Sequence, residues 1–271
     1  MTETNRKIRL GAVSYLNTVP LIYNLGDLND KVDLVLDVPS HLADALRRRE
    51  LDAGLIPIFE VLQSDEYFVV SDACIACSGP VWSVKLLSRC PIDQAKRVLL
   101  DEGSRTSIAL TQVLFHHLWK ANPVFESLPL AADYHDADGD AVLIIGDRAM
   151  QDDVTFEYQY DLGEVWHEWT GLPFVFAVWA MRAGPKLGVL DRGLSVARDS
   201  GLLKLDQIVS DQWQRYGLTK DQCRNYLANN LKFTLREPER MAVRRFAELC
   251  VSASLLPCDS MVRFYDCKLV G

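Results

Sequence analysis

Two short polar segments carry side chains whose types and spacing suit the binding of an anion. Ser14–Thr18 directly follows the apolar pattern of residues 8–13, and Ser104–Ser107 follows the apolar run at residues 98–100. A polar loop that joins a strand to a helix presents backbone N–H groups and short donor side chains to an anion. Two such loops, each behind a predicted strand, indicate a cleft for a small molecule that carries carboxylate groups.

A third junction of this kind places Gly146 and Asp147 directly after the apolar run at residues 141–145. Asp147 is the one carboxylate within these three polar segments, and an exposed aspartate with an ordinary pKa is a weak base at neutral pH. The same residue types also serve as helix N-caps and turn residues. Arg105 suits a carboxylate clamp, although we favour an ion pair at the surface or between lobes.

Strand and helix patterns alternate along most of the chain. Apolar or alternating runs predict strands, and the segment from Pro39 onward predicts a helix with Ser40 as its N-cap. The predicted strands include residues 7–13, 32–38, 53–58, 68–70, 81–87, 98–100, 141–145 and 174–181. A helical stripe begins at Ser107, and residues 188–248 are mostly helical with few strand signals. This alternation is typical of an α/β fold.

These elements form two groups without an obvious linker, which predicts a two-lobed protein in which the chain crosses between the lobes twice. We expect residues 1–92 and 178–271 to form one discontinuous lobe, and residues 93–177 to form the other. The crossings then fall near residues 87–96 and 173–179. A ligand is expected between the lobes, at the carboxyl ends of the strands.

Composition and charge narrow the class of protein. The 271 residues are 49% hydrophobic and 24% charged, which suits a large packed core and excludes disordered and fibrous classes. A net charge of −8 argues against a nucleic-acid partner. Residues 1–7 lack the apolar core of a signal peptide, and no later run suits a membrane span. Seven irregularly spaced cysteines fit a reducing compartment, so we expect a cytoplasmic location and no membrane partner.

Several conspicuous side chains are better explained by packing than by chemistry. We expect packing or surface roles for the Cys74–Cys77 pair, His116, His117, Trp166, Trp169 and Trp179. The cysteine pair has no second CxxC, and the histidines have no ligand partners at a suitable spacing. Because no phosphate-binding glycine loop, nucleotide fingerprint or metal-spaced His/Cys set is present, we expect no metal and no cofactor.

Six segments of the sequence, in order, resemble the motifs of one family, the chorismate dehydratases of the futalosine route to menaquinone. They are Ser14–Leu21, Asp52–Pro57, Gly79–Val84, Ser104–Ser107, Ile144–Asp147 and Thr170–Ala177. The resemblance runs through most of the chain and is weakest beyond about Gly184. It implies a fold similar to the type II periplasmic binding proteins, which close around a ligand.

The reaction that the resemblance implies is loss of water from chorismate, which gives 3-[(1-carboxyvinyl)oxy]benzoate. The protein must hold two carboxylates, stabilise charge on the ring carboxylate and place a base at ring carbon C3. Because the motif loops are rich in neutral donors and poor in bases, we hypothesise that the substrate's own enolpyruvyl carboxylate removes the C3 proton. The competing hypothesis makes Asp147 the base.

The expected site residues divide into two groups. The catalytic group is Asn17, Ser83 and Asp147, with the first two orienting the substrate carboxylate, and the substrate-binding group is Ser14, Tyr15, Thr18, Thr106, Ser107 and Gly146. Two other functions stay open: a cytosolic, non-catalytic binding protein for a small carboxylate, and the sister dihydroxynaphthoate synthase, which takes a larger futalosine-derived compound. In each case the partner is a small molecule and not a nucleic acid.

Overall fold

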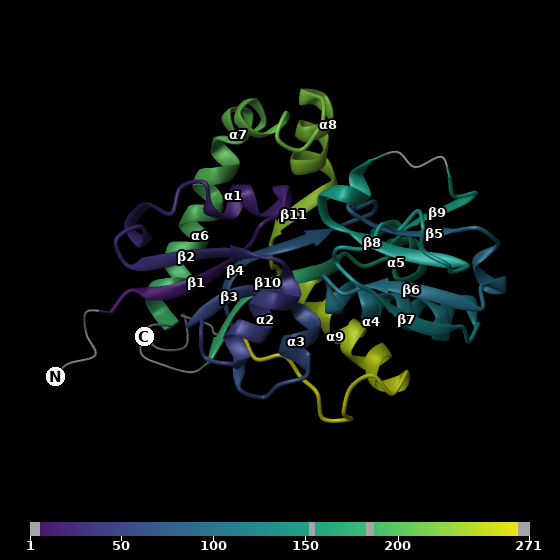
Figure 1. The fold of residues 1–271 in the computed structure, drawn as a ribbon. Coiled ribbons are helices and arrows are strands. Elements are labelled where there is room, and N and C mark those ends of the chain that lie inside the picture. Colours follow the sequence, from purple (N-terminus) through teal and green to yellow (C-terminus); the bar gives the residue numbers. More distant parts are fainter. Residues whose placement is uncertain (1–5, 152–154, 183–186, 265–271) are drawn as a thin grey trace.

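Two β-sheets lie side by side, each flanked by helices, and they form the two lobes of the molecule (Figure 1). The structure is a computed structural model that describes residues 6–151, 155–182 and 187–264. Both sheets are mixed, with parallel strands joined through helices and antiparallel strands near the crossings. The expected two-lobed α/β fold is confirmed.

The first lobe is built on a six-stranded sheet with the order β11-β4-β10-β3-β1-β2. Its strands are β1 (Ile8–Val13), β2 (Val32–Asp37), β3 (Ala53–Pro57), β4 (Tyr67–Cys77), β10 (Phe174–Arg182) and β11 (Leu231–Thr234). Strand β1 runs parallel to β2 and β3, whereas β10 runs antiparallel to β3 and β4. The short strand β11 lies in the region predicted to be mostly helical and was not expected.

Helices from both halves of the chain cover this sheet. They are α1 (Val19–Ile22), α2 (Pro39–Arg47), α3 (Ile58–Leu62), α6 (Leu187–Leu203), α7 (Leu205–Gln212), α8 (Lys220–Asn225) and α9 (Glu237–Ser252). Shorter turns are the 3₁₀ helices η2 (Leu16–Thr18) and η3 (Gly26–Leu28) and the π-helical turn η7 (Tyr226–Asn230). Helix α9 contacts both β10 and the second lobe, so it lies against the two lobes at once (Figure 1).

The second lobe is built on a five-stranded sheet with the order β7-β6-β8-β5-β9. Its strands are β5 (Val84–Ser88), β6 (Arg97–Asp101), β7 (Val124–Leu128), β8 (Ala141–Ile145) and β9 (Tyr158–Asp161). Its helices are α4 (Arg105–Leu114) and α5 (Leu162–Thr170), with the turns η4 (Ile92–Gln94), η5 (Phe115–Trp119) and η6 (Gly146–Met150). Strand β6 runs parallel to β7 and β8, so the carboxyl ends of these three strands share one edge.

Sheet membership moves both lobe boundaries away from the positions expected from the sequence. Strand β5 lies before the expected boundary at residue 92, yet it pairs with β8 and β9 of the second sheet. The boundary at residue 177 would divide β10, which pairs along its length with β3 and β4. The chain therefore changes sheet between residues 78 and 83, and again between residues 162 and 173.

Local sequence explains how the helices beside the lobe boundary begin. The Ser104 hydroxyl caps α4 by accepting a hydrogen bond from the Ser107 N–H at 3.3 Å. The expected cap of α2 by Ser40 is wrong, because extended Val38 occupies the N-cap position and Pro39 starts the first turn. The Ser40 N–H instead donates to the Gly103 carbonyl of the second lobe at 3.1 Å.

The packing roles expected for the tryptophans and cysteines are confirmed. Trp166 and Trp179 are fully buried, and the Trp166 indole N–H donates to the Pro173 carbonyl at 2.9 Å. Cys74 and Cys77 lie buried in strand β4 as free thiols. These side chains hold the core of the two lobes together and do not face a ligand site.

Of the two histidines on the second-lobe turn η5, His116 is exposed and His117 packs. His117 lies 3.1 Å from the Leu249 carbonyl of α9 and stacks on Trp169. Among the residues that the structure describes, no group of three or more His, Cys, Asp or Glu side chains is arranged to hold a metal ion. None of the described helices is long and apolar enough to span a membrane.

Candidate active site

A pocket lies between the lobes, at the carboxyl ends of the parallel strands of both sheets. Fifteen residues line it: Val13, Tyr15, Asn17, Pro39, Pro57, Ile75, Val81, Ser83, Val84, Ser104, Ser107, Ile145, Gly146, Phe176 and Ala177. This edge is where open α/β sheets bind ligands, because the loops there converge on one crevice.

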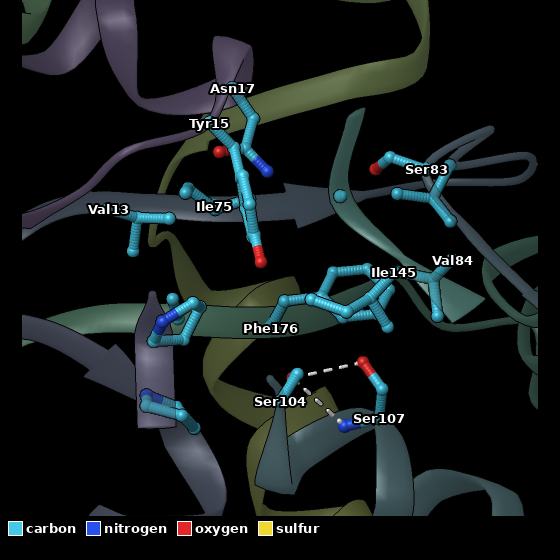
Figure 2. Close-up of a pocket in the computed structure, with 15 residues that line it drawn as sticks. Val13, Tyr15, Asn17, Ile75, Ser83, Val84, Ser104, Ser107, Ile145 and Phe176 are labelled. Atoms are coloured by element: carbon cyan, nitrogen blue, oxygen red, sulfur yellow. Dashed lines mark hydrogen bonds between the residues drawn. The ribbon is translucent and has the colours of Figure 1, made fainter. Parts of the chain in front are cut away.

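The polar groups of the pocket come from three junctions. Tyr15 and Asn17 follow β1, Ser83 precedes β5, and Ser104 and Ser107 flank the start of α4. Figure 2 shows the Tyr15 hydroxyl reaching into the pocket, with Asn17 and Ser83 above it in this view and the two α4 serines below. The pocket therefore carries neutral donors at two separated ends.

Apolar side chains form the walls between these donors. Ile75 comes from β4, Phe176 from β10, and Val84 and Ile145 from neighbouring strands of the second sheet (Figure 2). Within the described part of the chain, none of the lining residues is Asp, Glu, His, Lys or Arg. Burial raises the pKa of Tyr15 well above its usual value, so its phenol stays protonated and can donate a hydrogen bond.

The Tyr15 ring packs against Gly146, and both residues line the pocket. Gly146 has a φ of +74°, a left-handed conformation that glycine adopts without strain. A Cβ at this position would stand 2.8 Å from the Tyr15 ring, closer than carbon atoms pack. Both the backbone conformation and the aromatic contact therefore require a glycine here.

Asp147 joins the two lobes next to this contact. Its carboxylate accepts a hydrogen bond of 3.1 Å from the Leu16 N–H, and it is not among the residues that line the pocket. Burial raises the pKa of Asp147 to about 6, although the Leu16 N–H and the Arg215 charge act in the opposite direction. Its neighbour Arg148 forms an ion pair with buried Asp101, which anchors the same turn.

Three of the expected substrate-binding residues lie outside the pocket lining. Thr106 is fully buried and its hydroxyl accepts from the Phe59 N–H of the first lobe at 3.2 Å. The fully buried Thr18 hydroxyl donates to the Asn17 side-chain oxygen at 3.2 Å. Ser14 is exposed outside the lining, and its N–H donates to the Asp37 carbonyl. The structure thus places these three outside the pocket and places Tyr15, Asn17, Ser83, Ser107 and Gly146 within its lining.

Arg105 is an interlobe ion-pair residue, as favoured from the sequence. Its guanidinium lies 2.8 Å from the Asp44 carboxylate of α2 and 2.8 Å from the Glu60 carboxylate of α3. With both carboxylates engaged, the guanidinium is held at the lobe boundary and is absent from the pocket lining.

Two polar residues near the pocket were missed from the sequence. Ser104 was noted as part of a motif but not assigned to the site, and its hydroxyl oxygen accepts from both the N–H and the hydroxyl of Ser107 (Figure 2). Tyr226 is fully buried, and its hydroxyl donates to Ser83 at 2.8 Å. Nothing local in the sequence around Tyr226 signals this contact, because the two residues are 143 positions apart.

Replacing Gly146 by alanine tests the contact between Gly146 and the Tyr15 ring. We expect Gly146→Ala to lower the free energy of unfolding by about 2–4 kcal/mol, from left-handed strain plus the clash with the Tyr15 ring. Gly171→Ala is the matched control: Gly171 has a φ of +69° but open space around it. This control should lose about 1–2 kcal/mol from strain alone. Equal losses in the two variants, measured by urea unfolding, would contradict the ring contact.

The burial of Asp147 predicts a pH dependence of stability. A carboxyl pKa raised from 3.8 to about 6 stabilises the fold below about pH 4, and this contribution is lost as the pH rises through 6. We expect the unfolding free energy of the wild type, relative to Asp147→Asn, to fall by about 2 kcal/mol between pH 4 and pH 7. Asparagine keeps an acceptor for the Leu16 N–H, so the difference reports the charge. A flat difference across this range would show that the carboxyl is not desolvated.

The amino-acid sequence of almost the whole chain is similar to those of two chorismate dehydratases. The chain is 30% identical to a chorismate dehydratase of Thermus thermophilus, over 88% of this chain and 93% of that relative. It is 26% identical to a chorismate dehydratase of Campylobacter jejuni, over 90% of this chain and 98% of the relative. The two relatives align with almost the whole chain, including the C-terminal part where the motif resemblance is weakest.

Solved structures share the two-lobed architecture. Protein AF1704 of Archaeoglobus fulgidus superposes with a TM-score of 0.74 at 16% identity, over 94% of this chain and 100% of that one. The alkanesulfonate-binding protein SsuA of Xanthomonas axonopodis, bound to MOPS, superposes with a TM-score of 0.59 at 14% identity. The match covers 97% of this chain and 98% of that one. At these identities the likeness concerns the fold, which is that of the periplasmic binding proteins. A family model described as menaquinone biosynthesis matches residues 8–252, and the chain belongs to this menaquinone biosynthesis family.

Proposed function

We propose that this protein is a chorismate dehydratase, a hydro-lyase that converts chorismate to 3-[(1-carboxyvinyl)oxy]benzoate and water. The observation that carries the proposal is the interlobe pocket, which has neutral donors at two ends and apolar walls between them. Its family membership and the named activity of its two relatives support the same reaction.

The pocket suits a ring with two carboxylates. One end offers Asn17, Ser83 and the Tyr15 phenol, and the other offers the Ser104 hydroxyl, whose oxygen accepts from Ser107 at the start of α4. The ten-residue helix α4 directs its first N–H groups and the positive end of its dipole to that second end. Apolar walls exclude water from the ring, which strengthens each hydrogen bond to a carboxylate.

In the proposed mechanism, the substrate's enolpyruvyl carboxylate removes the proton from C3. The electron pair of that C–H bond moves toward the ring carboxylate, where donors stabilise the developing enolate-like charge. The C4–O bond then breaks, the hydroxyl leaves as water with the proton that the enolpyruvyl carboxylate took from C3, and the ring becomes aromatic. Asn17 and Ser83 orient the carboxylate that acts as base.

Two observations favour a base that belongs to the substrate. The described lining residues carry no carboxylate or imidazole, and Asp147 accepts from the Leu16 N–H outside the lining. In the proposal Asp147 therefore holds the lobes together and does not take the proton. Its raised pKa follows from burial at the lobe boundary.

Incubation of the purified protein with chorismate tests the proposed function. We expect chorismate to be lost and an aromatic enolpyruvyl ether, lighter by one water, to accumulate in mass-resolved chromatography. Saturable binding without any product would instead favour a non-catalytic carboxylate-binding protein. Turnover of only a larger futalosine-derived compound would favour the sister synthase.

Variants of the polar residues separate the two candidate bases. Ser83→Ala should lower kcat by about 100-fold, as expected for loss of one preorganised donor. Ser14→Ala, a change in the same motif region but outside the pocket lining, should leave kcat within about two-fold, since it removes no contact with the site. Asp147→Asn should keep most of the turnover; a variant that binds chorismate but has lost nearly all turnover would overturn the substrate-assisted mechanism.

A further inference from the structure

The fully buried Tyr226 hydroxyl lies next to both residues to which the proposed mechanism gives the orienting role. Tyr226 starts the turn η7, which leads into edge strand β11 of the first sheet. Its hydroxyl donates to the Ser83 oxygen at 2.8 Å, and the Asn17 side chain is a second hydrogen-bonding neighbour of the same hydroxyl. Tyr226 itself is not a lining residue, so it reaches the pocket only through these two side chains.

We propose that Tyr226 is a positioning residue for the dehydration: by donating to the Ser83 oxygen, it directs the Ser83 proton into the pocket toward the substrate carboxylate. This role rests on the proposed function and adds a residue to it. A serine hydroxyl has one proton and can accept further hydrogen bonds at its oxygen. Because Tyr226 supplies the proton between the two oxygens, the proton of Ser83 points elsewhere, and Ser83 lines the pocket.

The hydrogen bonds of Thr18 and Tyr226 have directions that leave the Asn17 NH₂ group and the Ser83 hydroxyl as donors. The Thr18 hydroxyl donates to the Asn17 oxygen, which leaves the Asn17 NH₂ group to donate. Burial raises the pKa of Tyr226 far above its usual value, so the phenol keeps its proton and stays a donor. The hydrogen bond from the Tyr226 hydroxyl polarises the Ser83 hydroxyl and strengthens it as a donor.

The backbone just before Ser83 is held by hydrogen bonds to η7 and to Asp161. Loss of the Tyr226 hydroxyl should therefore change the orientation of the Ser83 hydroxyl more than the position of its backbone. The Asn230 side chain of η7 donates to the Pro80 carbonyl at 2.9 Å. The Asp161 carboxylate accepts from the Val81 N–H at 2.9 Å and from the Trp82 N–H. These contacts fix the backbone independently of Tyr226.

The Tyr226 ring also has a packing partner that survives loss of its hydroxyl. Its edge lies against Trp82, with ring centroids 5.7 Å apart and an interplanar angle of 69°. Phenylalanine keeps this ring contact and removes only the oxygen. Tyr226→Phe is therefore a change confined to the hydrogen bonds to Ser83 and Asn17.

Steady-state kinetics of Tyr226→Phe with chorismate test the proposal. We expect kcat to fall by about 10-fold, because the Ser83 hydroxyl loses the neutral hydrogen bond that orients it, while KM changes by less than about three-fold. Tyr67→Phe is the matched control, because Tyr67 is a buried tyrosine of β4 whose hydroxyl contacts Arg182 and lies outside the pocket lining. It should leave kcat unchanged.

A double-mutant cycle distinguishes positioning from a general structural role. If Tyr226 acts through Ser83, adding Tyr226→Phe to Ser83→Ala should lower kcat by less than about two-fold further. A full additional loss in the double variant would show that Tyr226 does not act through Ser83 and would overturn the proposal. So would a Tyr226→Phe variant with the kcat and KM of the wild type.

Turnover by the wild-type protein separates the proposed role of Tyr226 from the proposed dehydratase activity on which it rests. Wild-type turnover with an unaffected Tyr226→Phe variant contradicts the positioning role alone. A wild type that does not dehydrate chorismate contradicts the proposed function, and the role of Tyr226 in it. Thermal unfolding of each variant, expected within a few degrees of the wild type, confirms that the kinetic losses are not losses of folded protein.

Discussion

The site depends on one contact between the lobes, where the residues after β1 meet the residues after β8. The Tyr15 ring lies on Gly146, and the Leu16 N–H donates to the Asp147 carboxylate at 3.1 Å. Only a residue without a Cβ lets the ring approach this closely at a φ of +74°. Because the donors of the pocket are divided between the two lobes, this contact holds Tyr15 of the first lobe against the second lobe.

Charged groups build the framework around the pocket, and neutral groups line it. Arg105 pairs with Asp44 and Glu60 across the lobes, and Arg148 pairs with Asp101 beneath the turn that carries Asp147. Holding a dianion with hydroxyls, an amide and a helix N-terminus avoids burying a counter-charge whose desolvation is costly. It also explains how a chain of net charge −8 can carry a site for an anion, since local dipoles act at close range.

Two serines in the lining share one arrangement. The Ser104 oxygen accepts from the Ser107 hydroxyl and N–H, and the Ser83 oxygen accepts from the Tyr226 hydroxyl. In each case a neighbour occupies the oxygen and the serine's own proton is directed elsewhere. Hydroxyls held in this way are preorganised donors, which require little reorientation as charge develops on a bound carboxylate.

Much of the fold followed from short-range patterns in the sequence. The apolar runs predicted β1, β3, β8 and β10 to within one or two residues, and the helical stripe from Ser107 predicted α4 to within two residues of its start. These features depend on residues a few positions apart, whose burial and capping are decided locally. The polar segments behind the strands also indicated where the pocket lies, because parallel strands end at a common edge.

Only the tertiary structure decided which polar groups face the pocket and which are used inside the protein. Thr106 accepts from Phe59 and Asp147 from Leu16, partners that lie 47 and 131 positions away. Tyr226 reaches Ser83 across 143 positions, and β5 joins the second sheet through strands that follow it in the chain. A hydroxyl or carboxylate has the same local signature whether it meets a ligand or a distant N–H. The sequence by itself therefore determined the donors available near the cleft, and the packing of the lobes determined their use.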